Sequence, residues 1–278
     1  MKTILKFISL IFLPYQLFGQ GWAQGKNNGY IKLSQNFISS SNYYAPDGSQ
    51  VKITTISQFN TGIYGELGLS KHLTGLINLP ILVHQRLNDI KYRQSGKTIP
   101  GDQLSGVGDA DIGVKFSFSQ NKSIVLSSSL WFGMPLGKTF GGKTGILQTG
   151  DGEFNQFLRI DASHSFYPKP IYISAYGGFN NRTKDFSDEL RYGLEIGYSF
   201  KKFTPILKIN GITSLQNGPA FTSQGSLFAN NVEFLSPALD FNYLLKSKFG
   251  LNASVASAFY GKNVLSALNY NFGAFLKW

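Results

Sequence analysis

The sequence has no cysteine, only three histidines, few charged residues and no long hydrophobic run. Without cysteine, the 278-residue chain can hold no disulfide, no thiolate metal site and no cysteine nucleophile. Charged residues make up 15% of the chain, whereas about 25% is usual for a soluble domain. Beyond residue 23, no stretch reaches the roughly 18 apolar residues that a membrane-spanning helix needs. These absences exclude a disulfide-stabilised domain and argue against a helical membrane protein.

Aromatic residues are abundant instead. The 24 Phe, 14 Tyr and 3 Trp together equal in number the 26 basic and 15 acidic residues. With a hydrophobic content of 42%, this composition excludes intrinsic disorder. The length accommodates a single all-β barrel.

The N-terminus has the pattern of a secretory signal peptide. Lys2 and Lys6 precede an apolar run over residues 7–13 that is too short to span a bilayer. We therefore expect export from the cytoplasm.

The small residues Gly21 and Ala23 predict cleavage after position 23. This gives a signal peptide over 1–23 and a barrel domain over 24–278. Cleavage near 19–20 is a second possibility, and an uncleaved amphipathic anchor is the alternative to any cleavage.

The basic excess does not indicate nucleic-acid binding. Without Lys2 and Lys6, 24 basic and 15 acidic residues remain, a formal charge of +9. An exported protein does not meet nucleic acid, and no basic run is longer than Lys201-Lys202. Anionic lipid head groups are a better partner for positive charge scattered in this way.

Alternation of apolar and polar residues recurs along the chain and predicts β-strands. In residues 190–200 the even positions are all apolar or aromatic, while the odd positions are Arg191, Gly193, Glu195, Gly197 and Ser199. Such runs reach about 11 residues or more, whereas strands of soluble proteins average about 5–6. Transmembrane strands need about 9–11 residues, so the length favours a membrane barrel.

Twelve such runs are predicted, near residues 29–39, 51–69, 73–86, 109–119, 123–134, 154–167, 171–179, 189–200, 203–215, 231–244, 249–260 and 263–278. Short turns alternate with longer connections, which are expected near 40–50, 87–108, 135–153, 180–188 and 216–230. An even strand number and this alternation of connections are typical of outer-membrane barrels, with both termini on the periplasmic side. The predicted fold is an all-β, up-and-down antiparallel transmembrane barrel of about twelve strands. An exported sandwich or lipocalin-like barrel is the soluble alternative, but the polar faces carry too few charges to coat a soluble surface.

The C-terminal run resembles the β-signal of bacterial outer-membrane proteins. Its outward face carries Tyr270, Phe272 and Leu276, and the chain ends in the aromatic Trp278, where most members have Phe. The resemblance implies recognition by the barrel-assembly machinery. Aromatic residues also favour bilayer interfaces, so this composition has a second explanation that again places the run in a membrane.

Two short motifs resemble those of the outer-membrane family named for the MetA pathway of phenol degradation. The segment 106–118 reads GVGDADIGVKFSF, and 147–152 reads LQTGDG, where Gln148 replaces the usual Pro and Ala110 replaces a larger aliphatic residue. The resemblance implies an outer-membrane barrel for passive passage of small, often aromatic, molecules, without a cofactor.

Asp109 and Asp151 each follow a glycine in these motifs. An acidic external rim or a calcium site is one interpretation; turn chemistry, with Asp capping its neighbouring backbone amides, is the favoured one. The spacing of Asp109 and Asp111 is similar to a calcium loop but lacks its later ligands, so we expect no metal.

Charged residues of both signs fall on the predicted inner faces. The candidate pore-facing residues are Glu66, His84, Arg86, Asp109, Asp111, Lys115, Arg159, Asp161, Arg191, Glu195 and Lys208. They could line an aqueous passage or close it with salt bridges, since twelve strands lie between the filled 8-strand barrels and the open 16-strand porins.

The histidines do not indicate catalysis. His72 falls in a predicted turn, and His164 is predicted to face outward beside Ala162 and Phe166. No serine or carboxylate shares that face with His164, so no triad forms and we do not expect an enzyme.

We therefore expect a bacterial outer-membrane channel for passive passage of small hydrophobic or aromatic molecules. Its expected partners are outer-membrane lipids, the assembly machinery and the solute, and not nucleic acid. A non-conducting structural or surface-interaction barrel is the first alternative, and a lipid hydrolase is the second.

Overall fold

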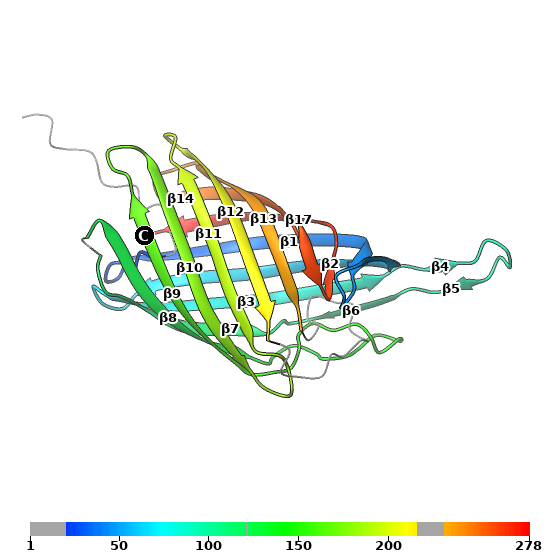
Figure 1. The fold of residues 1–278 in the computed structure, drawn as a ribbon. Helices are drawn as coiled ribbons and strands as arrows, with labels where there is room; N and C mark the ends of the chain where they lie inside the picture. The colour runs from blue at the N-terminus through cyan, green and yellow to red at the C-terminus, as the bar shows by residue number, and fades with distance from the viewer. Residues whose placement is uncertain (1–20, 121, 216–230) are drawn as a thin grey trace, which may run out of the picture.

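The computed structural model describes residues 21–120, 122–215 and 231–278. Most of the expected signal peptide and the connection at 216–230 lie outside these described residues. Within them, twelve antiparallel strands form the wall of a closed barrel (Figure 1). The wall strands are β1 (Gly29–Tyr44), β2 (Gln50–Gly68), β3 (Leu73–Leu87), β7 (Ala110–Ser117), β8 (Ile124–Met134), β9 (Asn155–Ser165), β10 (Ile171–Arg182), β11 (Glu189–Tyr198), β12 (Phe203–Ser214), β13 (Glu233–Leu244), β14 (Phe249–Ser257) and β17 (Leu268–Lys277). The fold expected from the sequence is confirmed.

The first and last strands close the barrel. β1 pairs antiparallel with β17 from Tyr30 opposite Lys277 to Ile38 opposite Asn269. Closure leaves no open sheet edge, which a hydrocarbon environment does not tolerate.

Five short strands extend this wall or its loops. β6 (Asp102–Gly106) pairs with β3 along the same edge as β7. β15 (Tyr260–Lys262) and β16 (Val264–Leu265) extend the final hairpin. β4 (Ile90–Lys91) and β5 (Thr98–Ile99) form a hairpin that projects well beyond the barrel (Figure 1). The sequence predicted this region only as a long loop.

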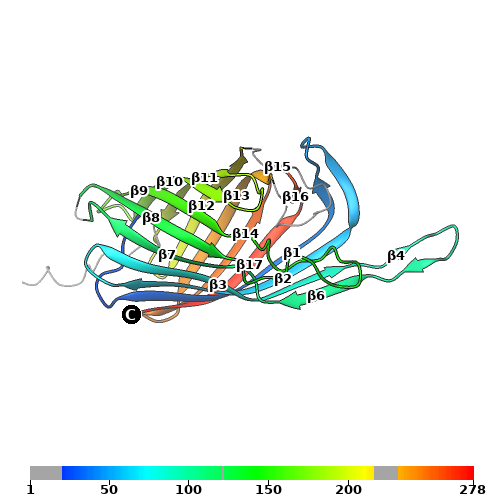
Figure 2. The same cartoon turned by 90° about the horizontal axis from the view of Figure 1, so that it is seen from below.

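The two ends of the barrel differ in their connections. The short-turn end carries the C-terminus and five short connections, at 69–72, 118–123, 166–170, 199–202 and 245–248 (Figure 2). The long-loop end carries the β4–β5 hairpin and the connection between β8 and β9. At this end the connection expected at 40–50 is only a five-residue turn, because β1 ends at Tyr44 and β2 begins at Gln50.

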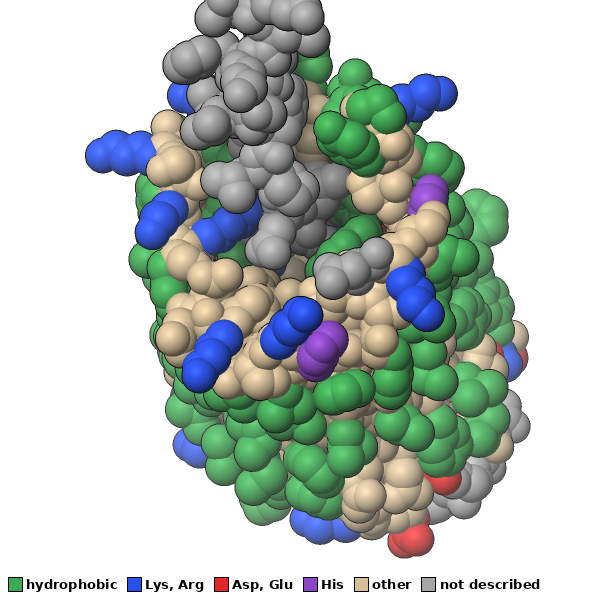
Figure 3. Space-filling view, turned by 90° about the vertical axis from the view of Figure 1, so that its left-hand side faces the viewer, with side chains coloured by type: hydrophobic (Ala, Val, Ile, Leu, Met, Phe, Trp, Pro, Cys, Tyr) green, Lys and Arg blue, Asp and Glu red, His purple; other side chains and the backbone are tan. Residues whose placement is uncertain are grey.

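The outer wall is apolar. Side chains on its outward positions, such as Leu33, Leu158 and Leu194, are exposed. Seen from the short-turn end, hydrophobic side chains cover the wall and basic side chains gather near its rim (Figure 3). The short turns contain seven lysines and no acidic residue: Lys71, Lys122, Lys169, Lys201, Lys202, Lys246 and Lys248. Among the described residues, no helix is long and apolar enough to cross a membrane.

A β-bulge in β3 reverses its inward and outward faces. Gly62 lies opposite Pro80 and Thr61 opposite Leu82, so the intervening Ile81 is an extra residue. Beyond the bulge Val83 and Gln85 are buried. A shift of one residue moves every following side chain to the opposite face.

The inward placement expected for His84 and Arg86 is therefore wrong. His84 lies opposite the outward-facing Phe59 and its Nδ1 is 2.7 Å from the Ser105 hydroxyl. Arg86 is exposed on the same outer face.

Candidate functional site

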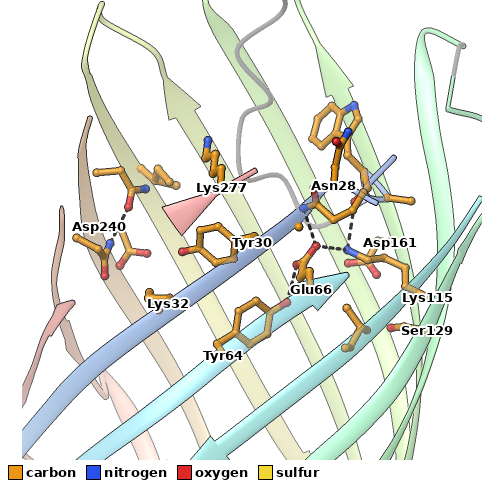
Figure 4. Close-up of a pocket in the computed structure, with 18 of the residues that line it drawn as sticks. Asn28, Tyr30, Lys32, Tyr64, Glu66, Lys115, Ser129, Asp161, Asp240 and Lys277 are labelled. Carbon is orange, nitrogen blue, oxygen red and sulfur yellow. Dashed lines mark hydrogen bonds and ion pairs between the residues drawn. The ribbon is translucent and has the colours of Figure 1, made fainter. Parts of the chain in front are cut away.

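The barrel encloses a cavity of about 400 Å³ near its short-turn end (Figure 4). Five cationic side chains line it, namely Lys32, Lys115, Arg159, Lys208 and Lys277. Three anionic side chains line it as well, namely Glu66, Asp161 and Asp240. The lining side chains therefore carry a formal excess of two positive charges.

Ion pairs join several of these side chains, within one strand or between different strands. Lys115 Nζ lies 3.6 Å from Glu66 Oε2, and the two side chains point toward one another in Figure 4. Arg159 and Asp161, two residues apart on β9, are 2.6 Å apart. Each pair is largely buried, and an ion pair satisfies charges that burial alone would make unfavourable.

Lys208 on the opposite wall has two acidic partners. It pairs with Asp240 of β13 and lies 3.6 Å from Glu195 of β11. Lys32, by contrast, makes no hydrogen bond or ion pair in the part of the chain that the structure describes. The ammonium group of Lys32 is therefore available to a molecule in the cavity.

Aromatic rings alternate with these charges. Tyr30 and Tyr64 meet edge to face at 6.1 Å, and the Tyr64 hydroxyl donates to Glu66 at 2.6 Å. Trp131 and Trp22 also line the cavity. The cavity therefore offers aromatic surfaces beside positive charges.

The connection between β8 and β9 folds into the long-loop end. Leu147, Gln148 and Thr149 are almost completely buried, and the Gln148 N–H donates to the side-chain oxygen of Gln85 at 3.0 Å. Because the Gln85 side chain points from β3 into the barrel, the loop that bonds to it narrows the lumen.

Asp109 holds the same loop. Its carboxylate accepts hydrogen bonds from the backbone N–H groups of Gly137 at 2.8 Å and Asp151 at 2.7 Å. The two glycine–aspartate motifs therefore meet in space, and Asp109 caps amides distant in sequence. A Cβ on Gly150 would collide with the Asp109 carboxylate, which explains the glycine there.

Arg182, at the end of β10, anchors the loop from the other side. Its guanidinium pairs with Asp151 at 2.7 Å, Glu153 at 2.8 Å and Glu189 at 2.9 Å. Three carboxylates surround one cation, and burial, with the neighbouring Glu153 and Asp109 charges, raises the pKa of Asp151 to about 7.

Known structures share this architecture. An outer membrane channel from Pseudomonas putida F1 superposes with a TM-score of 0.66 at 13% identity, covering 94% of this chain and 98% of that chain. The NanC porin gives 0.55 at 7% identity, covering 89% and 100%. The KdgM porin, in complex with disordered oligogalacturonate, gives 0.50 at 7% identity, covering 90% and 99%.

The fold is that of outer-membrane β-barrels. No protein-family model matches the sequence, and no curated protein matches it either.

The pore-facing residues expected from the sequence fall into four groups in this barrel. Glu66, Lys115, Arg159, Asp161 and Lys208 line the cavity. Asp111, Arg191 and Glu195 point inward elsewhere: Asp111 accepts from Asn78 at 3.0 Å, and Arg191 pairs with Glu189 at 2.6 Å. Asp109 ties the loop, and His84 and Arg86 lie outside. The expected assembly-signal residues Tyr270, Phe272, Leu276 and Trp278 are exposed, the first three on the outward face of β17.

The histidines lie near the short turns or on the outer wall. His164 Nδ1 is 2.7 Å from the backbone oxygen of Ser123 and 3.3 Å from its hydroxyl. A nitrogen that donates to the carbonyl cannot also accept the hydroxyl proton, so this pair is not arranged as a nucleophile and base. Within the described ranges, no group of three or more His, Asp or Glu side chains could hold a metal ion.

Sequence reasoning missed Lys32, Asp240 and the N-terminal residues of the cavity. The first two were detectable, because Lys32 alternates with Ile31 and Leu33 on a predicted strand. The part played by Trp22 had no such signal.

Proposed function

We propose that this protein is a bacterial outer-membrane channel for the passive passage of small aromatic or hydrophobic molecules. The observation that carries the proposal is a charged and aromatic cavity inside a closed barrel whose outer wall is apolar. A structural barrel has no need of a hydrated charged interior, because apolar side chains could fill it at lower cost. The fold shared with channels and porins supports the same function.

The cavity further favours aromatic molecules that carry a negative group. Tyr30, Tyr64 and Trp131 offer ring faces and edges, and the five cations outnumber the three anions. A carboxylate entering the lumen would meet Lys32 without displacing an existing ion pair. A purely hydrophobic solute would leave this charged lining unsolvated.

We also infer that the chain belongs to the family named for the MetA pathway of phenol degradation. The two motifs that carry the resemblance meet in space, where the Asp151 N–H donates to the Asp109 carboxylate, so they form one structural unit. On this proposal, the barrel-assembly machinery reads the strand that ends at Trp278, and the lysines of the short turns face lipid head groups.

Flux into proteoliposomes tests the function. We expect benzoate to enter faster than benzylamine, which has a similar size and the opposite charge. Lys32→Glu removes the charge excess of the cavity and should abolish this preference. Lys97→Glu makes the same charge change in the exposed β4–β5 hairpin and should leave the preference intact.

Two results would contradict the proposal. A folded barrel with neither conductance in planar bilayers nor solute flux would favour the non-conducting surface protein. Equal flux of the two solutes in the wild type would retain the channel but refute the anion preference.

A further inference from the structure

The bulge in β3 places Arg86 on the outer wall of the barrel. Its side chain is exposed there and makes no hydrogen bond or ion pair within the part of the chain that the structure describes. A charged side chain on the lipid-facing wall is strongly unfavourable at the middle of a bilayer and costs little near its interfaces. Without the extra residue Ile81, the outward position would fall to Gln85 instead. The depth of Arg86 along the wall therefore decides what it can contact.

A row of rings marks that depth. The row consists of the outward side chains of Tyr270, Phe37, Phe59 and His84, which lie opposite one another on β17, β1, β2 and β3. The ring centroids of Phe37 and Phe59 are 4.8 Å apart, and those of Phe59 and His84 are 6.0 Å apart. Aromatic side chains gather where the hydrocarbon of a bilayer meets its head groups. The row therefore marks the interface on the side of the long loops.

Arg86 lies one step beyond this row, toward the long loops. It is opposite Ser57 of β2 and Gln103 of β6. The Ser57 hydroxyl is 2.8 Å from the hydroxyl of Ser39 on β1. Polar side chains thus replace the rings of β1, β2 and β3 at the next outward position, about 7 Å further along each strand. This step places the Arg86 guanidinium at the depth of the lipid head groups.

The surface around Arg86 is positive. Among the described residues, the outward positions of β1, β2, β3 and β6 carry no aspartate or glutamate. The β4–β5 hairpin, which continues β3 beyond the wall, adds Lys91, Arg93 and Lys97 (Figure 1). Its single acidic residue is Asp89, whose carboxylate accepts from the Gly101 N–H at 2.7 Å. A negatively charged group at head-group depth would therefore meet attraction and no opposing carboxylate.

We propose that Ser57, His84, Arg86 and Gln103, here called the outer-wall patch, bind the phosphate group of a phosphorylated lipid in the leaflet at the long-loop end. The guanidinium offers a planar pair of N–H donors that matches two phosphate oxygens, and the Gln103 amide offers another donor beside it. The rings of Phe37 and Phe59, one step deeper, lie where the acyl chains of the same lipid begin. This inference rests on the membrane placement in the proposed function, and it does not depend on conduction.

Native mass spectrometry of the detergent-solubilised barrel tests the patch, with diphosphoryl lipid A as the probe. We expect the wild type to retain one lipid, and Arg86→Gln to weaken the apparent affinity at least about tenfold, because a charge-assisted pair of bonds is lost. Arg86→Lys keeps the charge without the planar donor pair, so its affinity should lie between the two.

Arg93→Gln is the matched control, since it makes the same change of charge in the projecting hairpin. It should weaken binding by less than about threefold, because that charge acts through solvent. Equal weakening by Arg86→Gln and Arg93→Gln would assign binding to the diffuse charge of this end and overturn the patch.

The chemistry of the lipid supplies a second test. Lipid A without its phosphates should bind the wild type and Arg86→Gln equally. Inorganic phosphate at the same concentration as the lipid should not displace it, because free phosphate lacks the acyl chains. Complete displacement would mean that the patch binds free phosphate and would overturn the lipid proposal.

The outcomes separate this proposal from the channel. Equal retention of diphosphoryl lipid A by the wild type and a folded Arg86→Gln would refute the patch and retain the channel. Lipid retention that depends on Arg86, in a barrel with neither conductance nor solute flux, would retain the patch and refute the channel. Heat-modifiable migration on gels shows whether each variant is folded.

Discussion

The carboxylate of Asp109 accepts a hydrogen bond from the backbone N–H of Asp151 at 2.7 Å. This bond joins two glycine–aspartate motifs that are separated by β7, β8 and most of the loop between β8 and β9, and it holds that loop inside the long-loop end. The sequence interpretation, aspartate capping of neighbouring backbone amides, gives the right chemistry for Asp109 but the wrong amides, because those it caps are distant in sequence.

Asp109→Asn should release this loop. The amide retains one acceptor oxygen and places an NH₂ donor toward the N–H of Gly137 or Asp151, so the tie should weaken by about 1–3 kcal/mol. Trypsin cleavage at Lys138 and Lys143 in intact cells should become faster. Asp47→Asn, in the exposed β1–β2 turn, should not change that rate; no difference between the variants would contradict the tie.

A second tie should persist in acid. Asp102 accepts from the Thr144 hydroxyl at 2.6 Å and the Thr144 N–H at 2.7 Å, and these bonds hold the pKa of its carboxyl well below its usual range. Because this pKa is depressed in the folded protein, its contribution is present above the ordinary value of about 3.9 and is lost only at lower pH.

Hydrogen exchange measures this tie. After correction for intrinsic rates, the Thr144 amide should be equally protected at pH 7 and pH 4. Asp102→Asn should lose the protection already at pH 7. Loss of protection between pH 7 and pH 4 in the wild type would show that Asp102 titrates normally.

Arg182 should be among the most sensitive positions. Its side chain is 5% exposed and pairs with three carboxylates. Arg182→Met leaves those carboxylates buried without their cation and should lower the free energy of unfolding by about 3–5 kcal/mol. Guanidinium unfolding in detergent measures the loss, and Arg86→Met, on the exposed outer wall, should change it by less than about 0.5 kcal/mol.

The bulge at Ile81 predicts opposite reactivity for two adjacent residues. Arg86→Cys should react rapidly with a polar thiol reagent, whereas Gln85→Cys, whose native side chain is 1% exposed, should react slowly. The absence of native cysteine makes each signal specific. The reverse order of reactivity would mean that alternation continues through β3 without a bulge.

The barrel was predictable because successive side chains of a strand point to opposite faces, so that apolar and polar residues alternate along it. Within the segments 190–200 and 264–278, the wall strands β11 and β17 expose the expected apolar face, although Phe275 interrupts the polar face of β17. The scarcity of charge follows from the same cause, since one face of each strand is apolar.

The inward and outward faces of β3 were predicted wrongly beyond the bulge. The run Leu79-Pro80-Ile81-Leu82 contains no polar residue to mark the change of face. Pro80 was a signal, because proline within a strand often accompanies a bulge. Without the partner strand, however, the position of the extra residue could not be fixed.

The twelve wall strands and the apolar outer wall follow from local sequence patterns, because they depend on a period of two residues. The pairing of the charges, the bond between Asp109 and Asp151 and the packing of Trp22 against Tyr172 depend on the three-dimensional fold. The Asp109–Asp151 and Trp22–Tyr172 contacts join residues about 40 and 150 positions apart. Closure of the barrel brings them together, and no local pattern encodes which distant wall a side chain will face.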